Sequence, residues 1–228
     1  FNISKDKELT FTPIINYGGG VDASQRFLFD YNQILSGGNL SLDLTFDSNF
    51  ENENNNKWVS DASIITNYKK NLNKNYKITI DSALQTSQNY IQITNPDNEL
   101  SYTNSLSTKL KLEGYYLRKI DDYIETNINF YQTNQKNEDN KTNPTVFPNV
   151  RYYSGNEIVK GNNLSNTYEF YNIFRDKNTD IHSKNQQKIS HRFNISRELI
   201  KFKSKILFKG ELYNQIFNTQ NKKLQTNE

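Results

Sequence analysis

Apolar and polar residues alternate along much of this chain. Leu40, Leu42 and Leu44 fall at even positions, and Ser41 and Asp43 lie between them. Successive side chains of a β-strand point to opposite faces, so this period of two predicts a strand with one apolar and one polar face. The same period recurs along the chain, and helical spacing is nowhere competitive over comparable lengths. The pattern predicts about eleven strands, near residues 8–17, 25–34, 39–49, 57–67, 75–85, 105–116, 123–132, 147–154, 166–175, 187–196 and 203–213.

The connections between the predicted strands alternate in length. Every second connection is mostly long, polar and rich in Asn, as at 50–56, 86–104, 133–146 and 176–186, whereas the others are on average shorter. Long loops at one end and tighter turns at the other are typical of outer-membrane barrels. Most predicted strands reach the ~9 to 11 residues that a tilted strand needs to cross a bilayer. We therefore expect an all-β fold, an antiparallel transmembrane β-barrel segment, with residues 1–228 forming part of one outer-membrane β-barrel domain.

Composition narrows the class of protein further. Aromatic residues make up 13% of the chain, too many for disorder, although the mean hydropathy is only -0.89. A barrel wall reconciles the two values, because only the lipid-facing half of its side chains need be apolar. No window approaches the roughly 20 apolar residues of a membrane-spanning helix. The net charge of +3 comes without a basic block, so we expect no nucleic-acid partner.

Candidate catalytic and metal-binding residues are few. The chain has no Cys, which excludes disulfides, thiolate metal sites and cysteine nucleophiles. His182 and His191 show no HExxH-like spacing, so we expect neither a metal nor a cofactor. Ser190 and His191 are adjacent in a predicted strand and point to opposite faces, which makes them unsuitable as a nucleophile and base. Asp121 and Asp122 lie at a predicted turn, where Asp bonds its own backbone. We expect no catalytic residues and no enzyme activity.

Two features of the sequence concern its boundaries. The chain contains no Met and begins at Phe1, from which we expect a fragment of a longer protein. No secretory signal is recognisable near Phe1, so we expect any such signal to lie upstream.

Several segments lie in the order seen in a known family of barrels. They are "ISKDKELTFTPIINYGGG", "SQRFLFDYNQILSGGNLSLDL", "TSQNYIQITN", "SLSTKLKLEGYY", "FPNVRYY", "YNIFRDKNTDIHSKNQQKISHRF" and "KILFKGELYNQ". Together they resemble the first part of the barrel in the LPS-assembly protein LptD family. Gln88 and Ile91 depart from the family, which has Asp and Leu at these two positions. The similarity covers nearly the whole chain, in motifs that are each short.

The resemblance implies a function in the cell outer membrane. Family members form a very large barrel, plugged by a lipoprotein partner, that receives lipopolysaccharide from a periplasmic bridge protein and releases it sideways between the first and last strands. The N-terminal domain that meets the bridge protein would be missing from this chain. The lateral-gate strand would carry Leu9, Phe11 and Pro13, because a proline removes one ladder donor and weakens a seam. The plainer interpretation is a strand that ends early or meets a bulge.

A basic face is predicted near the end of the chain. It consists of Lys201, Lys203, Lys205 and Lys209. The residues predicted on the opposite face are Ile200, Phe202, Ile206 and Phe208. A wet barrel lumen holds such charges cheaply, and this interpretation is favoured over a role in guiding lipopolysaccharide phosphates.

Two other classes of protein remain open. One is a different outer-membrane barrel, a porin or nutrient receptor, that passes solutes through its lumen. The other is a soluble or cell-surface β-rich binding protein. The surroundings of the row Leu40, Leu42 and Leu44 separate a membrane barrel from a soluble protein. A second protein layer packed on that row would contradict the membrane assignment.

Overall fold

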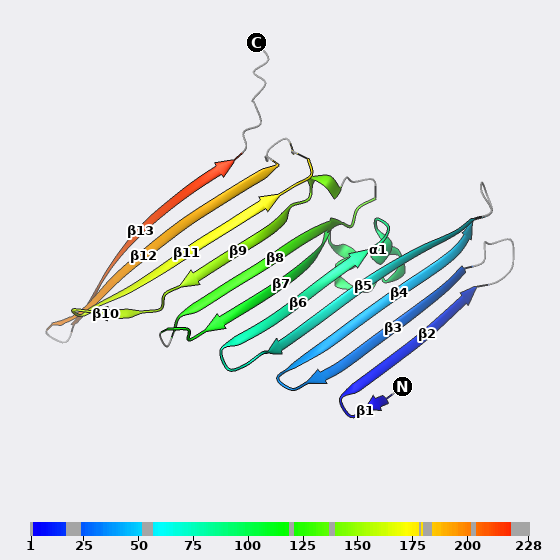
Figure 1. Ribbon diagram of the computed structural model, residues 1–228, viewed down its shortest axis with the longest axis horizontal. Coiled ribbons are helices and arrows are strands. Elements are labelled where there is room, and N and C mark those ends of the chain that lie inside the picture. Colours follow the sequence, from blue (N-terminus) through cyan, green and yellow to red (C-terminus); the bar gives the residue numbers. More distant parts are fainter. Residues whose placement is uncertain are drawn as a thin grey trace, which may run out of the picture. The chain divides into compact units, whose positions relative to one another are not determined.

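The strands lie side by side in chain order. The computed structural model describes residues 2–16, 24–51, 57–118, 121–136, 140–177, 179, 184–201 and 204–219. Within these residues, twelve strands form one open antiparallel sheet in the order β1 to β9 and then β11 to β13, and β10 pairs with β11 beside this path (Figure 1). The all-β antiparallel fold expected from the alternation is therefore confirmed.

The strands are β1 (Asn2–Ser4), β2 (Lys7–Asn16), β3 (Ser24–Leu35), β4 (Gly38–Glu51), β5 (Lys57–Asn71), β6 (Tyr76–Gln85), β7 (Ser105–Tyr115), β8 (Tyr123–Thr133), β9 (Thr145–Tyr153), β10 (Glu157–Val159), β11 (Asn162–Phe174), β12 (Asn185–Lys201) and β13 (Ser204–Thr219). The helices are α1 (Tyr90–Thr94) and the short 3-10 helices η1 (Glu99–Tyr102) and η2 (Asn140–Thr142). No helix in the described part of the chain is long and apolar enough to cross a membrane.

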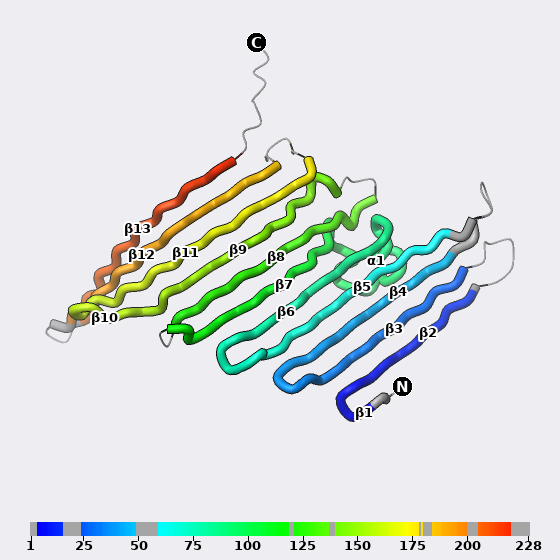
Figure 2. The backbone as a smooth tube through the Cα atoms, in the orientation of Figure 1, coloured from blue at the N-terminus to red at the C-terminus, as the bar shows by residue number. Residues whose placement is uncertain are grey.

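The connections differ in length as the sequence predicts. The turn between β3 and β4 consists of Ser36 and Gly37 alone, whereas the connection between β6 and β7 runs from 86 to 104. Figure 2 shows the tight return of the backbone between β3 and β4. Gly37 adopts φ +78 in this turn, a conformation that glycine reaches without steric cost.

The chain divides into two compact units, each with its own residues. The first unit comprises 1–71, 78–110 and 130–143, and the second comprises 72–77, 111–129 and 144–228.

In the first unit, the pairing register sorts side chains onto two faces. Phe11, Phe29, Leu44 and Ile64 are successive partners across β2, β3, β4 and β5, so they form one apolar row. The neighbouring row has the opposite phase and begins with Thr10, Asp30 and Asp43. Directly paired residues of an antiparallel sheet share a face, and the next residue along each strand takes the other. The first unit therefore has one mainly apolar and one mainly polar face.

The apolar face of the first unit is not deeply buried. Leu40, Leu42 and Leu44 are each half-buried, and Phe11 and Phe46 are 41% and 37% exposed.

The segment that packs on the first unit, residues 86–104, lies on the other, polar face. Its Ile91 is 1% exposed and forms a small core with Ala83 and Leu106, against which Ile65 and Leu100 pack. Ile65 shares the phase of Asp43, its direct partner across β4 and β5. The buried apolar cluster of the first unit therefore lies between this segment and the sheet, on the otherwise polar face.

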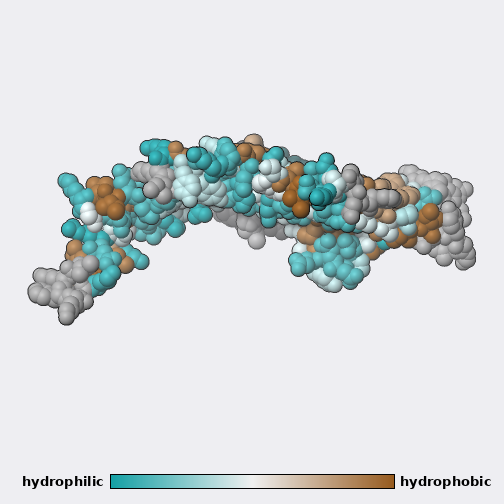
Figure 3. Space-filling view, turned by 90° about the horizontal axis from the view of Figure 1, so that it is seen from below, coloured by the Kyte–Doolittle hydropathy of each residue, from teal (hydrophilic) through white to brown (hydrophobic). Residues whose placement is uncertain are grey.

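The second unit shows the same separation of faces. Val150, Phe170, Ile189 and Ile216 form an apolar row across β9, β11, β12 and β13. Ile189 is 55% exposed and Ile216 is 70% exposed. Brown patches in Figure 3 mark hydrophobic residues that reach the surface. The adjacent row, of opposite phase, begins with Arg151 and its partner Glu169.

Candidate functional site

The three residues predicted for the gate strand all lie on β2. Register with β3 continues from Lys7 to Asn16 without interruption, and it pairs Pro13 with Phe27. The strand therefore neither ends early nor bulges at Pro13. Ile34 N donates to Asp6 O over 2.9 Å, which makes this opposed pair a hydrogen-bonded one. Hydrogen-bonded pairs alternate with non-bonded pairs, so Pro13 falls at a non-bonded pair and its missing donor faces away from β3.

β2 is an edge strand over most of its length. β1 pairs with it only through Asn2 opposite Glu8 and Ser4 opposite Lys7. Among the described residues, β3 is the one strand paired with β2 beyond this point. The ring of Phe11 lies 4.7 Å from that of Phe29. The structure thus places Leu9, Phe11 and Pro13 on an edge strand, next to a row of aromatic rings.

The predicted basic face is only partly correct. Lys205 and Lys209 have the same phase on β13, and both are exposed. The register pairs Lys201 with Ser204, so position 201 has the opposite phase to position 205. The sequence prediction counted positions 201 to 209 as one continuous alternation, and the pairing of β12 with β13 contradicts this. Lys203 lies outside the described residues. Lys205 Nζ lies 2.9 Å from Glu198 Oε1, so its charge is paired.

An ion pair between a half-buried arginine and a buried aspartate lies on the polar face of the first unit. Arg26 donates to both carboxylate oxygens of Asp47, over 2.7 Å from Nε and 2.9 Å from Nη2. Asp47 is 5% exposed, and β3 and β4 place the two residues directly opposite each other. Alternation along one strand does not reveal this pair, because it depends on the register between two strands.

Tyr90 of α1 packs near this ion pair. Burial, together with the negative charge of Asp47, raises the pKa of the Tyr90 phenol above its ordinary value. Its hydroxyl is buried and has no hydrogen-bond partner among the described residues. Tyr90 is therefore neutral over the physiological pH range.

Buried amides hold the 86–104 segment in place. Gln85 Oε1 accepts from Ile91 N over 3.0 Å, and Gln85 Nε2 donates to Asn134 Oδ1 over 3.1 Å. Asn134 Nδ2 in turn donates to Leu100 O over 2.9 Å and to Thr103 O over 3.0 Å. Gln85 and Asn134 are 6% and 0% exposed. The segment is thus a fixed part of the polar face, although its composition suggests only a long loop.

The second unit has a buried polar network on β7 and β8. Glu113 Oε1 accepts from Tyr115 Oη over 3.0 Å and from Tyr123 Oη over 3.3 Å. Lys111 Nζ lies 3.1 Å from the same oxygen. Tyr123 Oη also donates to Glu125, so one phenol joins two carboxylates. Glu113 Oε1 thus collects three donors, whereas Glu113 Oε2 is buried without a hydrogen-bond partner and has Lys77 Nζ 3.9 Å away.

Exposed charges lie on the polar face of β9 to β13. Arg151 Nε lies 3.2 Å from Glu169 Oε1, and Arg192 Nε lies 3.1 Å from Glu211 Oε1. Lys188 Nζ lies 5.5 Å from the centre of the Tyr171 ring, and the rings of Tyr213 and Phe217 are at similar distances. These contacts occur on the face opposite the Ile189 and Ile216 row.

His191 contacts two side chains of the neighbouring strand β11. His191 stacks on Tyr168 with ring centres 4.6 Å apart, and its Nε2 lies 3.0 Å from Asn166 Oδ1. Ser190 Oγ donates to Glu169 instead, on the opposite face. His182 lies outside the described residues. Among those described, no group of three or more His, Cys, Asp or Glu side chains is placed to hold a metal ion.

Asp121 and Asp122 join the connection after β7 to β9 and to the connection that follows β9. Asp121 Oδ2 accepts from Asn156 N over 2.9 Å, and Asp122 Oδ2 accepts from Tyr152 Oη over 3.2 Å. Asp121 thus binds the connection after β9, and Asp122 binds a side chain of β9 itself, rather than their own turn.

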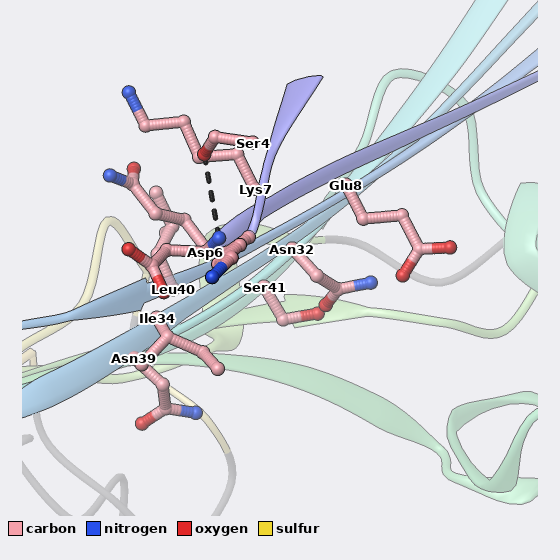
Figure 4. A pocket seen from close by; sticks show the side chains of 11 residues that line it. Ser4, Asp6, Lys7, Glu8, Asn32, Ile34, Asn39, Leu40 and Ser41 are labelled. Atoms are coloured by element: carbon pink, nitrogen blue, oxygen red, sulfur yellow. Dashed lines mark hydrogen bonds between the residues drawn. The ribbon is translucent and has the colours of Figure 1, made fainter. Parts of the chain in front are cut away.

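A cavity of about 300 Å³ lies beside the β1–β2 turn. Figure 4 shows side chains of both charges around it, and Asp6 N donates to Ser4 Oγ over 3.4 Å. Lys5, Asp6, Lys7 and Glu8, which line this cavity, are all exposed.

Comparisons with known proteins add no relative to this picture. No protein-family model matches the chain, and neither the curated proteins nor the solved structures give a significant match.

Proposed function

We propose that this chain is part of the wall of an outer-membrane β-barrel, and that the barrel exports lipopolysaccharide through a lateral gate. The observation that carries the barrel proposal is the separation of faces within each unit. Large apolar side chains such as Ile216, which is 70% exposed, lie on one face, and charged pairs lie on the other. A soluble sheet covers its apolar face with a second layer, whereas lipid covers it in a membrane barrel.

The export proposal rests on two further points. The segments quoted above resemble the LPS-assembly family in order, and Pro13 lies on β2 with its missing donor turned away from β3. In this proposal the chain acts without catalytic residues and provides a path for lipid. Its partners would be lipopolysaccharide, a plug lipoprotein, and a periplasmic bridge protein that binds another domain.

A solute-passing barrel is the second candidate. The 86–104 segment packs on the polar face of the first unit, which would line the lumen of a barrel. A segment in that position narrows the passage, a feature that suits a porin or nutrient receptor as well as an exporter.

Cysteine accessibility tests the barrel proposal. We expect Leu212→Cys and Ile216→Cys, in a cysteine-free full-length protein in membranes, to react at least about tenfold more slowly with a membrane-impermeant maleimide than Glu211→Cys and Gln215→Cys. All four positions are exposed in the structure, so only lipid would separate them. Equal reactivity after unfolding in urea is the control. Comparable rates at all four positions in the membrane would contradict the proposal.

Pro13→Ala tests the gate. Alanine restores an N–H donor on the outward edge of β2, and a stronger seam is expected to slow lipopolysaccharide release several-fold in a reconstituted transport assay. Pro96→Ala, in the exposed part of the 86–104 segment, is the matched control and should leave the rate unchanged. Normal export by Pro13→Ala would count against the gate, although it would leave the barrel proposal intact.

A further inference from the structure

Hydrogen bonds join three connections of the second unit. These connections are 72–75 between β5 and β6, 116–122 between β7 and β8, and 154–161 between β9 and β11. Asn75 Nδ2 donates to Tyr116 O over 3.4 Å, which joins the first connection to the second. Asp121 Oδ2 accepts from Asn156 N over 2.9 Å, which joins the second to the third. The three connections therefore form a continuous strip.

Each of these connections exposes a large apolar side chain close to a cation. Leu72 is 53% exposed, Tyr116 is 59% exposed and Val159 is 40% exposed. The neighbouring cations are Lys74, Arg118 and Lys160, which are exposed and form no ion pair with any described residue. We call these six residues the turn strip.

The carboxylates of the same connections do not neutralise the turn strip. Asp122 is 1% exposed and accepts from Tyr152, and Asp121 accepts from Asn156. Glu157 is exposed, and it interacts with another residue of the chain. The three cations of the turn strip therefore present their positive charge to the surroundings.

The turn strip is continuous with the apolar face of the second unit. Val159 of β10 pairs with Asn162 of β11. Position 162 has the same phase as Phe170, which belongs to the apolar row, so Val159 lies on the apolar face. Tyrosine, lysine and arginine at the border of an apolar face are the residues that proteins place at the boundary between lipid and water.

We propose that the turn strip binds the headgroups of anionic phospholipids at one surface of the bilayer. This inference rests on the barrel proposal, because the apolar face must lie in lipid. The apolar side chains enter the boundary of the acyl chains, while the three cations reach the phosphates. A protein interface has a contiguous core of buried side chains, whereas the turn strip presents single apolar side chains on separate connections. Lipid therefore fits the turn strip better than an acidic protein does.

Fluorescence quenching by labelled lipids tests the turn strip. A fluorophore is attached to Ile158→Cys, beside Val159, in a cysteine-free full-length protein. Ile158 is 76% exposed, so the label has room. The protein is reconstituted in phosphatidylcholine vesicles that contain a small, equal fraction of nitroxide-labelled phosphatidylglycerol or nitroxide-labelled phosphatidylcholine. We expect the anionic lipid to quench at least about threefold more strongly at low salt, and about 1 M salt to remove this preference.

Two charge-matched variants complete the test. The combined change Lys74→Gln, Arg118→Gln and Lys160→Gln should abolish the preference for the anionic lipid. The combined change Lys136→Gln, Lys177→Gln and Lys184→Gln removes three exposed cations of other connections and should retain it.

Equal quenching by the two lipids in the parent protein would overturn the proposal, and this is the result expected if an acidic protein is the partner instead. A preference that survives in the first variant would overturn it as well. Slow maleimide reaction of Leu212→Cys in the same vesicles shows separately whether the apolar face lies in lipid. Failure of the headgroup proposal is thereby distinguished from failure of the barrel proposal.

Discussion

Arg26→Gln is expected to lower the free energy of unfolding by about 3 kcal/mol. The substitution leaves the Asp47 carboxylate, which is 5% exposed, without its two-fold hydrogen-bonding partner. Removing one member of a buried pair costs more than the pair itself contributes, because the remaining charge stays buried. Urea titration of the full-length protein in lipid or detergent measures the change. Chymotrypsin cleavage near Tyr90 should also accelerate, since Tyr90 packs beside Asp47.

Arg151→Gln provides the comparison. Arg151 and Glu169 are 3.2 Å apart, with side chains 54% and 33% exposed. Water screens such a pair, so its loss is expected to cost less than about 1 kcal/mol. Equal destabilisation by the two variants would show that the Arg26 pair is not effectively buried in the folded protein.

Gly38→Ala is expected to destabilise the protein by about 3 kcal/mol through a backbone collision. A Cβ at this position would lie 1.9 Å from the carbonyl oxygen of Lys69 and 2.7 Å from Lys70 Cα. Neither atom belongs to a movable side chain, so β4 and β5 must separate at this end. Urea unfolding gives the size of the effect, and faster hydrogen exchange at the first residues of β4 gives its location.

Gly114→Ala provides the comparison, because its new Cβ would meet side-chain atoms and not backbone atoms. A Cβ there would lie 2.8 Å from Ile124 Cγ2 and 3.0 Å from the Tyr76 ring. These side-chain atoms can move aside, so the expected cost is about 1 kcal/mol. A Gly38→Ala protein as stable as Gly114→Ala would mean that the β4–β5 pairing is looser than its register indicates.

Alternation along the chain predicted most of the sheet, because each strand separates apolar from polar side chains. The period of two located β4 from Leu40 to Phe46 and β12 from Ile189 to Ile195. It missed β1 and β10, which are only three residues long and too short to show a period. It also placed the ends of β5 and β12 too early. Lys69 and Leu199 still pair with the neighbouring strand, although apolar and polar residues alternate less regularly there.

The sites proved harder to predict than the strands. Pairing of Asp30 with Asp43, or of Arg26 with Asp47, requires the β3–β4 register, which one strand's pattern does not contain. The same limit explains the error at Lys201, because the alternation was counted from β12 into β13 as if they were one strand. The packing of the 86–104 segment was missed for another reason. Its buried apolar anchors, Tyr90 and Ile91, lie among polar residues that resemble a solvated loop.

The position of Asn134 constrains the order in which the chain can assemble. This amide follows β8, yet it bonds the carbonyls of Leu100 and Thr103, which precede β7. During folding, Asn134 cannot form these two hydrogen bonds with the segment before β7 until β7 and β8 have formed. Forming these long-range hydrogen bonds costs more chain entropy than forming the neighbouring hairpins. We therefore expect helix α1 to take its final position after β6, β7 and β8 have paired.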